Sequence, residues 1–188
     1  PAPHAAPAIL ARGGAGRVGH YPIQWAPRGG APVIAPASNP AHSAACAHAG
    51  AHHVVDHRAG DFPSQVLEAT GGELINRVVD LEFGSNLPVS IEVLKVGGTI
   101  AAYGSARKPE PVLPFYKMMY KDLTLRTIIV YAMPDGANDH AVADINSGLS
   151  GVGLKHRIAH AMPLEDIIAG NEIVEAGEAR GAVILEID

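Results

Sequence analysis

The sequence predicts an α/β fold, namely a doubly wound, six-stranded parallel sheet with helices on both faces. Short apolar runs of strand length alternate with segments of helix length along the 188 residues. Such alternation is typical of parallel sheets covered by crossover helices. A glycine cluster also follows the first apolar run, where these folds turn from strand into helix. We expect a single domain over residues 1–188, with the core sheet in 7–132 and helices and a closing strand in 133–188.

Three strands and three helices are expected in the first part of the chain. The strands are 7–11, 31–36 and 53–55, and the helices are 17–28, 40–49 and 62–70. Asn39 is expected to cap the second helix, because its side chain can accept a hydrogen bond from the first turn and Pro40 suits the first helical position. Pro22 and Pro27 conflict with the first helix, because an interior proline costs roughly 3 kcal/mol.

The remaining strands are expected at 77–83, 99–103 and 123–131, followed by a closing strand at 182–187. The helix after the fourth strand is expected to have Ser85 or Asn86 as its cap and to stop at Gly97 and Gly98. Apolar residues three and four positions apart predict another helix around 141–149. A last helix from Pro163 is expected to bury four apolar side chains, namely Leu164, Ile167, Ile168 and Val174.

Composition and charge exclude several classes of protein. The first 55 residues carry three arginines and no carboxylate, and the remaining 133 carry a formal charge of −8. A positive first third without basic and aromatic clusters suits a phosphate-bearing small molecule and not a nucleic acid. No apolar run reaches the roughly 18–20 residues of a membrane span. The single cysteine, Cys46, excludes an internal disulfide, and the histidines lack the partners of a metal site. We expect a cytoplasmic protein without a metal ion.

The glycine cluster Gly14-Ala15-Gly16-Arg17-Val18-Gly19 has the pattern G-x-G-x-x-G between a strand and a helix. In dinucleotide-binding sites Gly14 would allow the tight turn, Gly16 would let the backbone approach a pyrophosphate, and Gly19 would let helix and sheet pack closely. Free amides at the helix start would then meet the anion. The pattern predicts a bound dinucleotide; the alternative is a glycine-rich turn without a ligand.

The acid that would hold a ribose 2′-hydroxyl about 20 residues after the motif is missing. That position falls at Ser38 and Asn39, and the first carboxylate of the chain is Asp56. A 2′-phosphate suits these donors better, with His42 and Arg58 available to supply charge. NADP(H) is therefore the expected cofactor, although a small polar strand end is also compatible with a capped turn alone.

Three stretches carry a family resemblance. They are G-G-A-G-R-V-G-H-Y-P-I-Q-W-A, A-G-A-H-H-V-V-D-H-R and V-L-K-V-G-G-T-I-A-A-Y-G-S, in this order. Residues 7–187 resemble the cofactor-binding half of the medium-chain dehydrogenase/reductase superfamily, and within it the zinc-independent NADPH:quinone oxidoreductase group that includes zeta-crystallin. The resemblance implies a Rossmann sheet, NADPH, and hydride transfer to a quinone or another electron-poor double bond.

The resemblance also implies site residues. The phosphate loop comprises Gly14, Gly16, Arg17, Val18 and Gly19. The 2′-phosphate region comprises Ser38, Asn39, His42, His57 and Arg58. The nicotinamide side comprises Phe83, Gly84, Tyr103, Gly104, Ser105 and Tyr131. No catalytic residue is identified. His42 stands where the family often has Lys, His57 where it often has Tyr, and Arg17 where a small residue is usual. Because neutral histidine binds phosphate more weakly than lysine, these differences affect cofactor affinity.

Two further expectations concern partners. The family begins with a GroES-like domain that forms part of the substrate pocket, and this chain is expected to lack it. The alternative function is therefore a non-catalytic NADP(H)-binding or sensing module, or a subunit that serves a partner chain. The sixth strand is apolar on both faces, and in the resembled family this edge pairs across a dimer, so we expect a homodimer through it.

Overall fold

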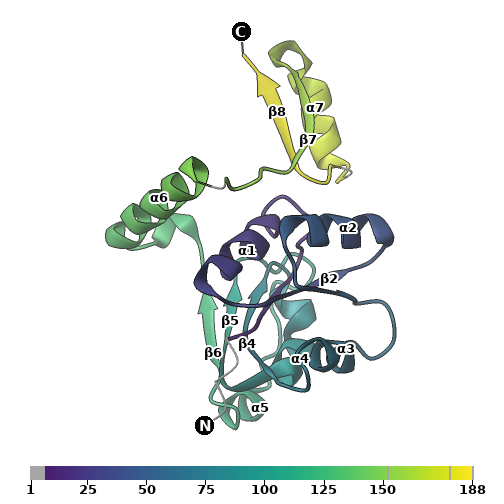
Figure 1. Cartoon of the computed structure of the whole chain (residues 1–188), viewed down its shortest axis with the longest axis vertical. Helices are drawn as coiled ribbons and strands as arrows, with labels where there is room; N and C mark the ends of the chain where they lie inside the picture. Colours follow the sequence, from purple (N-terminus) through teal and green to yellow (C-terminus); the bar gives the residue numbers. More distant parts are fainter. Residues whose placement is uncertain (1–6, 152, 178, 188) are drawn as a thin grey trace.

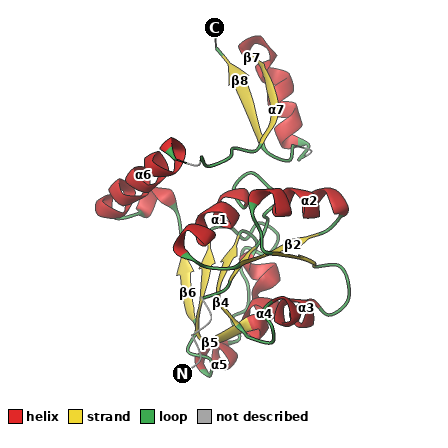
Figure 2. Cartoon of the chain, viewed as in Figure 1, coloured by secondary structure: helices red, strands yellow, loops and turns green. Residues whose placement is uncertain are grey.

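The main sheet has six parallel strands in the order β3-β2-β1-β4-β5-β6, which confirms the predicted fold class (Figures 1 and 2). The structure is a computed structural model that describes residues 7–151, 153–177 and 179–187. The strands are β1 (Ile9–Ala11), β2 (Val33–Ala37), β3 (His53–Asp56), β4 (Ile75–Asp80), β5 (Leu94–Ala102) and β6 (Thr124–Thr127). The strands up to β3 are added on one side of β1 and the strands from β4 on the other, so the carboxyl ends of β1 and β4 flank a crevice suited to a ligand.

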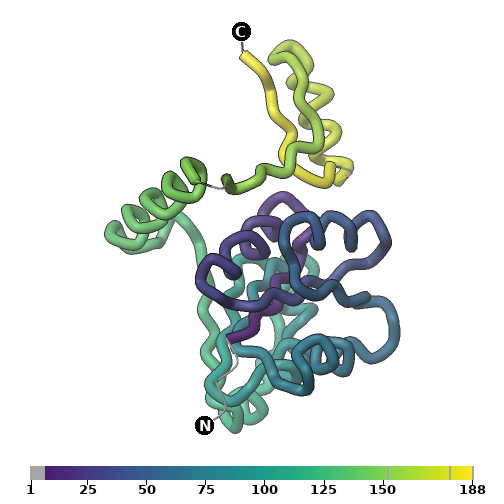
Figure 3. Tube along the Cα trace, in the orientation of Figure 1, coloured from purple at the N-terminus to yellow at the C-terminus, as the bar shows by residue number. Residues whose placement is uncertain are grey.

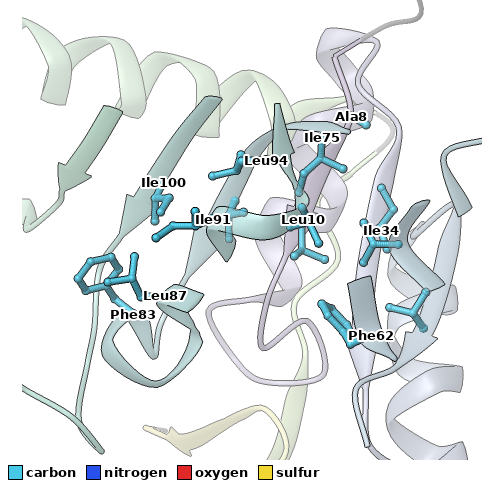
Figure 4. Close-up of a cluster of buried hydrophobic side chains, with 14 of the residues drawn as sticks. Ala8, Leu10, Ile34, Phe62, Ile75, Phe83, Leu87, Ile91, Leu94 and Ile100 are labelled. Atoms are coloured by element: carbon cyan, nitrogen blue, oxygen red, sulfur yellow. The ribbon is translucent and has the colours of Figure 1, made fainter. Parts of the chain in front are cut away.

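Helices cover both faces of the sheet because successive side chains of each strand point to opposite sides. The helices are α1 (His20–Trp25), α2 (Pro40–Ala49), α3 (Phe62–Ala69), α4 (Phe83–Val93), α5 (Phe115–Met119) and α6 (Asp135–Ser150). Leu10 of β1 packs in a cluster with α3 and α4, whereas the next residue, Ala11, packs with α1 and α2. Figure 4 shows the first of these clusters, in which Leu10, Ile34, Ile75 and Ile100 are fully buried.

The first helix is shorter than predicted, and this resolves the conflict with its prolines. Residues 12–19 form a turn, and α1 begins at His20 instead of Arg17. Pro22 therefore lies in the first turn, where no backbone donor is required of it. α1 ends at Trp25, and a separate 3₁₀ turn (Ala26–Gly29) follows with Pro27 at its start. By contrast, the predicted cap of α2 is correct, since the side chain of Asn39 accepts a hydrogen bond from the His42 amide.

Three predicted boundaries around α4 are wrong. β4 ends at Asp80, and α4 begins at Phe83 without a side-chain cap, so Ser85 and Asn86 lie inside the helix. Asn86 instead donates to the Asp80 carboxylate. α4 ends at Val93 and the chain enters β5 directly at Leu94. Gly97 and Gly98 do not stop the helix. They lie in an irregular part of β5, where Ile75 pairs with Leu94 and Arg77 already pairs with Thr99.

The end of the chain forms a separate small unit. β7 (Ile158–Pro163), which was not predicted, pairs with β8 (Ala182–Glu186) in a two-stranded parallel sheet, and α7 (Ile167–Glu175) connects them. Figures 1 and 3 show this unit projecting from the six-stranded sheet. The four apolar side chains expected to be buried by the last helix are exposed, namely Leu164, Ile167, Ile168 and Val174. The apolar periodicity correctly predicted a helix, but the main sheet does not cover the apolar face of α7.

The sixth strand is also shorter than predicted. β6 ends at Thr127, and residues 130–132 form a 3₁₀ turn. β6 is the outer strand of the sheet, next to β5. No helix among the described residues is long and apolar enough to cross a membrane.

Candidate functional site

The turn between β1 and α1 is built on glycine, but the roles differ from those expected. Gly13, which lies before the predicted motif, is the glycine with a left-handed backbone (φ 69°), and it allows the tight turn that was assigned to Gly14. The Gly16 amide donates to the Gly13 carbonyl over 2.8 Å and closes this turn. The backbone of the loop is thereby held at the carboxyl end of β1.

Gly14 and Gly19 are needed for close packing. A Cβ on Gly14 would overlap Ile23 of α1 and approach the Cys46 sulfur of α2 to 3.1 Å. A Cβ on Gly19 would overlap the carbonyl group of Gly13. These two glycines therefore bring α1 and the loop against one another, as the motif requires of its last glycine. Arg17 and Val18, between them, are exposed.

Polar side chains follow the carboxyl ends of β2 and β3. Ser38 Oγ lies 2.9 Å from Nδ1 of His42 in the first turn of α2. His57 Nδ1 lies 2.8 Å from the Ala37 carbonyl oxygen, to which it donates a hydrogen bond. In neutral His57 the other ring nitrogen is then an acceptor, so this side chain can donate to a phosphate only when it is protonated.

These elements surround a groove of about 420 Å³ at the carboxyl ends of the strands. The glycine turn contributes Gly13, Ala15 and Gly16, and the β2 and β3 ends contribute Ser38, His42 and His57. The loop after β4 forms the opposite wall through Leu81, Glu82, Ser85 and Asn86. A groove that joins a glycine turn to the end of the second strand has the form of a dinucleotide site.

Three arginines that sequence reasoning missed line the groove. Arg12 lies at the end of β1, Arg107 in the loop after β5, and Arg180 just before β8. Arg180 is far from the motif in sequence, so no local pattern could have placed it there. In the part of the chain that the structure describes, one carboxylate, Glu82, lines the groove, and it accepts hydrogen bonds from the Arg107 amide (2.8 Å) and from Ser85 Oγ (3.2 Å).

Burial affects the ionisation of two groups in this region. The pKa of His42 is lowered by burial and, to a smaller extent, by the nearby charges of Arg180, Arg157, Arg58 and His57. The pKa of Arg12 is lowered by burial, against the opposing effect of the Asp80 carboxylate. The groove therefore contains a histidine whose protonated form an anionic ligand would stabilise.

The loops after β4 and β5, expected on the nicotinamide side, are tied to one another. The Phe83 amide donates to the Gly104 carbonyl over 2.9 Å, and the Gly84 amide donates to Ser105 Oγ over 2.8 Å. A Cβ on Gly104 would lie 2.5 Å from the Leu81 carbonyl oxygen, so the loops leave no room for a side chain there. Tyr103 is partly buried, and burial followed by the Asp80 charge raises the pKa of Tyr103 to about 12.

The structure thus brings together four of the predicted site residues around the groove, namely Gly16, Ser38, His42 and His57. Asn39 faces the first turn of α2 as its cap, and the Arg58 amide donates to Asp56. Tyr131 lies beyond β6 and is 92% exposed. The other predicted residues shape or adjoin the loops without lining the groove, namely Gly14, Arg17, Val18, Gly19, Phe83, Gly84, Tyr103, Gly104 and Ser105.

A larger hollow of about 790 Å³ lies elsewhere, between α4 and α5. Its lining is mainly apolar and includes Leu87, Ile91 and Val112, together with Lys108, Lys117 and Lys121. Lys121 Nζ donates to the carbonyls of Ile91, Glu92 and Leu94. This lysine therefore connects the end of α4 to the loop before β6. No residue of the glycine turn lines this hollow.

Comparisons with known proteins relate most of the chain to one family. A family model described as zinc-binding dehydrogenase matches residues 18–144. The chain is 34% identical over 98 residues to a 2-haloacrylate reductase of Burkholderia sp, a match that covers 52% of this chain and 29% of that protein. It is 25% identical over 178 residues to a quinone oxidoreductase of Sus scrofa, covering 94% of this chain and 54% of that protein.

Solved structures give the same result at the level of the fold. A mycobacterial protein solved in complex with NADPH superimposes with a TM-score of 0.83 at 25% sequence identity, covering 96% of this chain and 57% of that one. The chain therefore spans about half the length of the quinone oxidoreductase and of this structural relative.

Proposed function

The chain belongs to the family described as zinc-binding dehydrogenases, and from this membership we propose that it binds NADP(H) in the groove beside the glycine turn. The activity we propose for the protein it represents is hydride transfer from NADPH to a quinone or another electron-poor double bond. The observation that carries the proposal is a groove joining the turn of Gly13 and Gly16 to three basic side chains, His42, His57 and Arg180. A reductase and a quinone oxidoreductase among the relatives support the choice of reaction.

The charges of the groove favour NADP(H) over NAD(H). A carboxylate at the end of β2 would bind the ribose hydroxyls of NAD and repel a 2′-phosphate. Here β2 ends at Ala37, followed by Ser38, and the acid at the end of β3, Asp56, accepts a hydrogen bond from the Arg58 amide. Ser38, His42, His57 and Arg180 would hold the 2′-phosphate, and the backbone at Gly13 to Gly16 would face the pyrophosphate.

When bound, NADPH supplies the hydride, and this chain positions it. The hydrogen-bonded loops at Gly84 and Gly104 form a wall beyond the groove. They pack so closely that neither glycine could carry a side chain. The name of the family includes zinc, but among the described residues no three His, Cys, Asp or Glu side chains gather as metal ligands.

Titration of the full chain with NADPH and NADH, followed by cofactor fluorescence, tests the cofactor proposal. We expect saturable binding of NADPH and affinity for NADH weaker by about tenfold or more, since a charge-assisted contact to phosphate contributes on the order of 1.5–3 kcal/mol. Arg180→Gln should weaken NADPH binding and leave NADH binding unchanged. Arg126→Gln, an exposed arginine in β6, is the matched control. Equal affinity for both cofactors would contradict the proposal.

The alternative is a module that binds NADP(H) without catalysis. The groove beside the glycine turn supports this function as well, because it accounts for cofactor binding and holds no identified catalytic residue. Measurement of NADPH oxidation with a soluble quinone separates the two functions. Turnover that depends on the quinone supports the reductase, whereas tight NADPH binding without turnover by the full chain supports the binding module.

We also propose a homodimer that pairs through β6. This strand is the edge of the sheet, so its outer backbone groups are available for pairing with a second copy. The residues that follow it are apolar and exposed, with exposed fractions of 58% for Ile129 and 59% for Val130. Light scattering on the eluting protein at micromolar concentration tests the proposal, and a monomeric mass would contradict it.

A further inference from the structure

A second basic hollow, separate from the cofactor groove, lies where the segment before β7 crosses α1 and α2. Its volume is about 590 Å³, and it is lined by His20, Ala45, His48, Lys155, His156 and Arg157. None of these residues lines the cofactor groove. Among the residues that the structure describes, every polar side chain in this lining is basic and none is a carboxylate. The volume falls within the range of roughly 300–1,000 Å³ that small-molecule sites occupy.

The basic residues come from α1, α2 and the segment before β7, and hydrogen bonds hold this segment against α1. The Lys155 amide donates to Gln24 Oε1 over 2.8 Å, and Gln24 Nε2 donates back to the Lys155 carbonyl over 3.0 Å. His156 Nδ1 lies 2.8 Å from the hydroxyl of Tyr21. The backbone of this segment therefore has a defined position over α1. Such preorganisation lowers the cost of binding a ligand.

His20 gives the hollow an unsatisfied polar group. This side chain is only 4% exposed, and its Nδ1 has no hydrogen-bond partner among the described residues. Burial lowers the pKa of His20, and the nearby charges of Arg157, His48 and His156 lower it further, against a hydrogen bond with the Lys155 backbone. A buried ring nitrogen without a partner is costly, and like charges gathered without a counter-ion repel each other. A bound anion would reduce this repulsion, and it would satisfy Nδ1 once His20 takes up a proton and donates from both ring nitrogens.

We propose that this hollow binds a phosphate group. Lysine, arginine and histidine N–H groups are the usual donors to phosphate oxygens, and charge-assisted hydrogen bonds of this kind are the strong ones. Lys155 and Arg157 supply permanent charge from one side, and His20 and His48 supply donors from α1 and α2. The phosphate group is either free or attached to a small organic molecule, for which the volume of the hollow leaves space.

Calorimetric titration of the full chain at constant ionic strength tests this site, with inorganic phosphate in one arm and phenyl phosphate in the other. We expect saturable binding in at least one arm. Tighter binding of phenyl phosphate would indicate an organic monoester, and tighter binding of inorganic phosphate would indicate the free ion. Because His48 and Lys155 are exposed, the H48Q/K155Q variant should fold and bind phosphate about tenfold or more weakly.

Two variants serve as controls. H53Q/K95Q removes the same side-chain types from exposed positions in β3 and β5, outside the hollow, and should leave phosphate affinity unchanged. R180Q weakens phosphate binding to the cofactor groove only, so the phosphate binding that H48Q/K155Q loses should persist in R180Q. Unsaturable heats in the unmodified chain, equal losses in H48Q/K155Q and H53Q/K95Q, or loss in R180Q alone would each overturn the proposal. NADPH binding, measured separately, should persist in H48Q/K155Q, so a failure of this site is distinguishable from a failure of the cofactor proposal.

Discussion

The guanidinium Nε of Arg12 lies 3.6 Å from Oδ2 of Asp80, and the pair is buried beneath the cofactor groove. Arg12 directly follows β1 and Asp80 ends β4, so the ion pair connects the two neighbouring strands at which the strand order switches sides. Asp80 Oδ1 also accepts hydrogen bonds from the Glu82 amide (2.8 Å) and from Asn86 (2.9 Å). This carboxylate therefore neutralises Arg12 and fixes the loop that forms one wall of the groove.

Asp80→Asn tests the importance of this pair for stability. The substitution keeps an oxygen acceptor for the Glu82 amide but leaves the buried charge of Arg12 without compensation. We expect the free energy of unfolding to fall by about 3–5 kcal/mol, as for other buried pairs that lose one partner. Urea denaturation followed by circular dichroism measures the change. R12M/D80N removes both charges and should recover part of the stability, and a D80N variant as stable as the unmodified chain would contradict this account.

Gly19→Ala tests the close contact between α1 and the glycine turn. The new Cβ would overlap the Gly13 carbonyl, so the turn has to shift. Overpacking of this kind costs typically about 1–3 kcal/mol. We expect lower stability together with weaker NADPH binding, because the shifted turn borders the groove. Gly29→Ala is the control, since no atom lies within 4 Å of a Cβ at that position. Equal effects of the two substitutions on NADPH affinity would show that the close contact is not needed.

The parts of the fold that depend on local pattern could be predicted, and those that depend on distant partners could not. The Asn39 cap, the strand runs and the glycine turn each follow from a few neighbouring residues. Arg180 reaches the groove from 142 positions beyond Ser38 (180 − 38 = 142), and only the folded chain brings the two together. The last helix shows the same limit. Its apolar periodicity is real, but periodicity does not say which surface covers Ile167 and Ile168, and both are exposed here.

The pH dependence of cofactor binding tests the role of His42. Burial and then the cations around the groove lower the pKa of His42 below its ordinary value of about 6.5, so the side chain is neutral at pH 7 in the free protein. Its protonated form donates to phosphate and is stabilised by it. Affinity for NADP⁺ should therefore rise as the pH falls below about 6.5.

His42→Gln removes this titration. Because the 2′-phosphate and the other cations are the same in both proteins, the ratio of the two affinities isolates the contribution of His42. We expect fluorescence-quenching titrations with NADP⁺ to show that the advantage of the unmodified chain over H42Q grows from pH 8 to pH 5.5. NAD⁺, which lacks the phosphate, should show no such trend. A constant ratio across this range would exclude His42 as a phosphate donor.

The proposed homodimer makes a prediction about the residues that follow β6. Ile129 is 58% exposed in the single chain, so replacing it with lysine should not disturb the core. A lysine beside an edge strand opposes pairing with another copy, because two like charges would then be buried at the interface. We expect I129K to elute as a monomer with unchanged circular dichroism, and V142K, at a residue of α6 that is 57% exposed, to remain dimeric. Light scattering measures both masses. If I129K is still a dimer, the copies associate through another surface, and the exposed apolar face of α7 is the next to test.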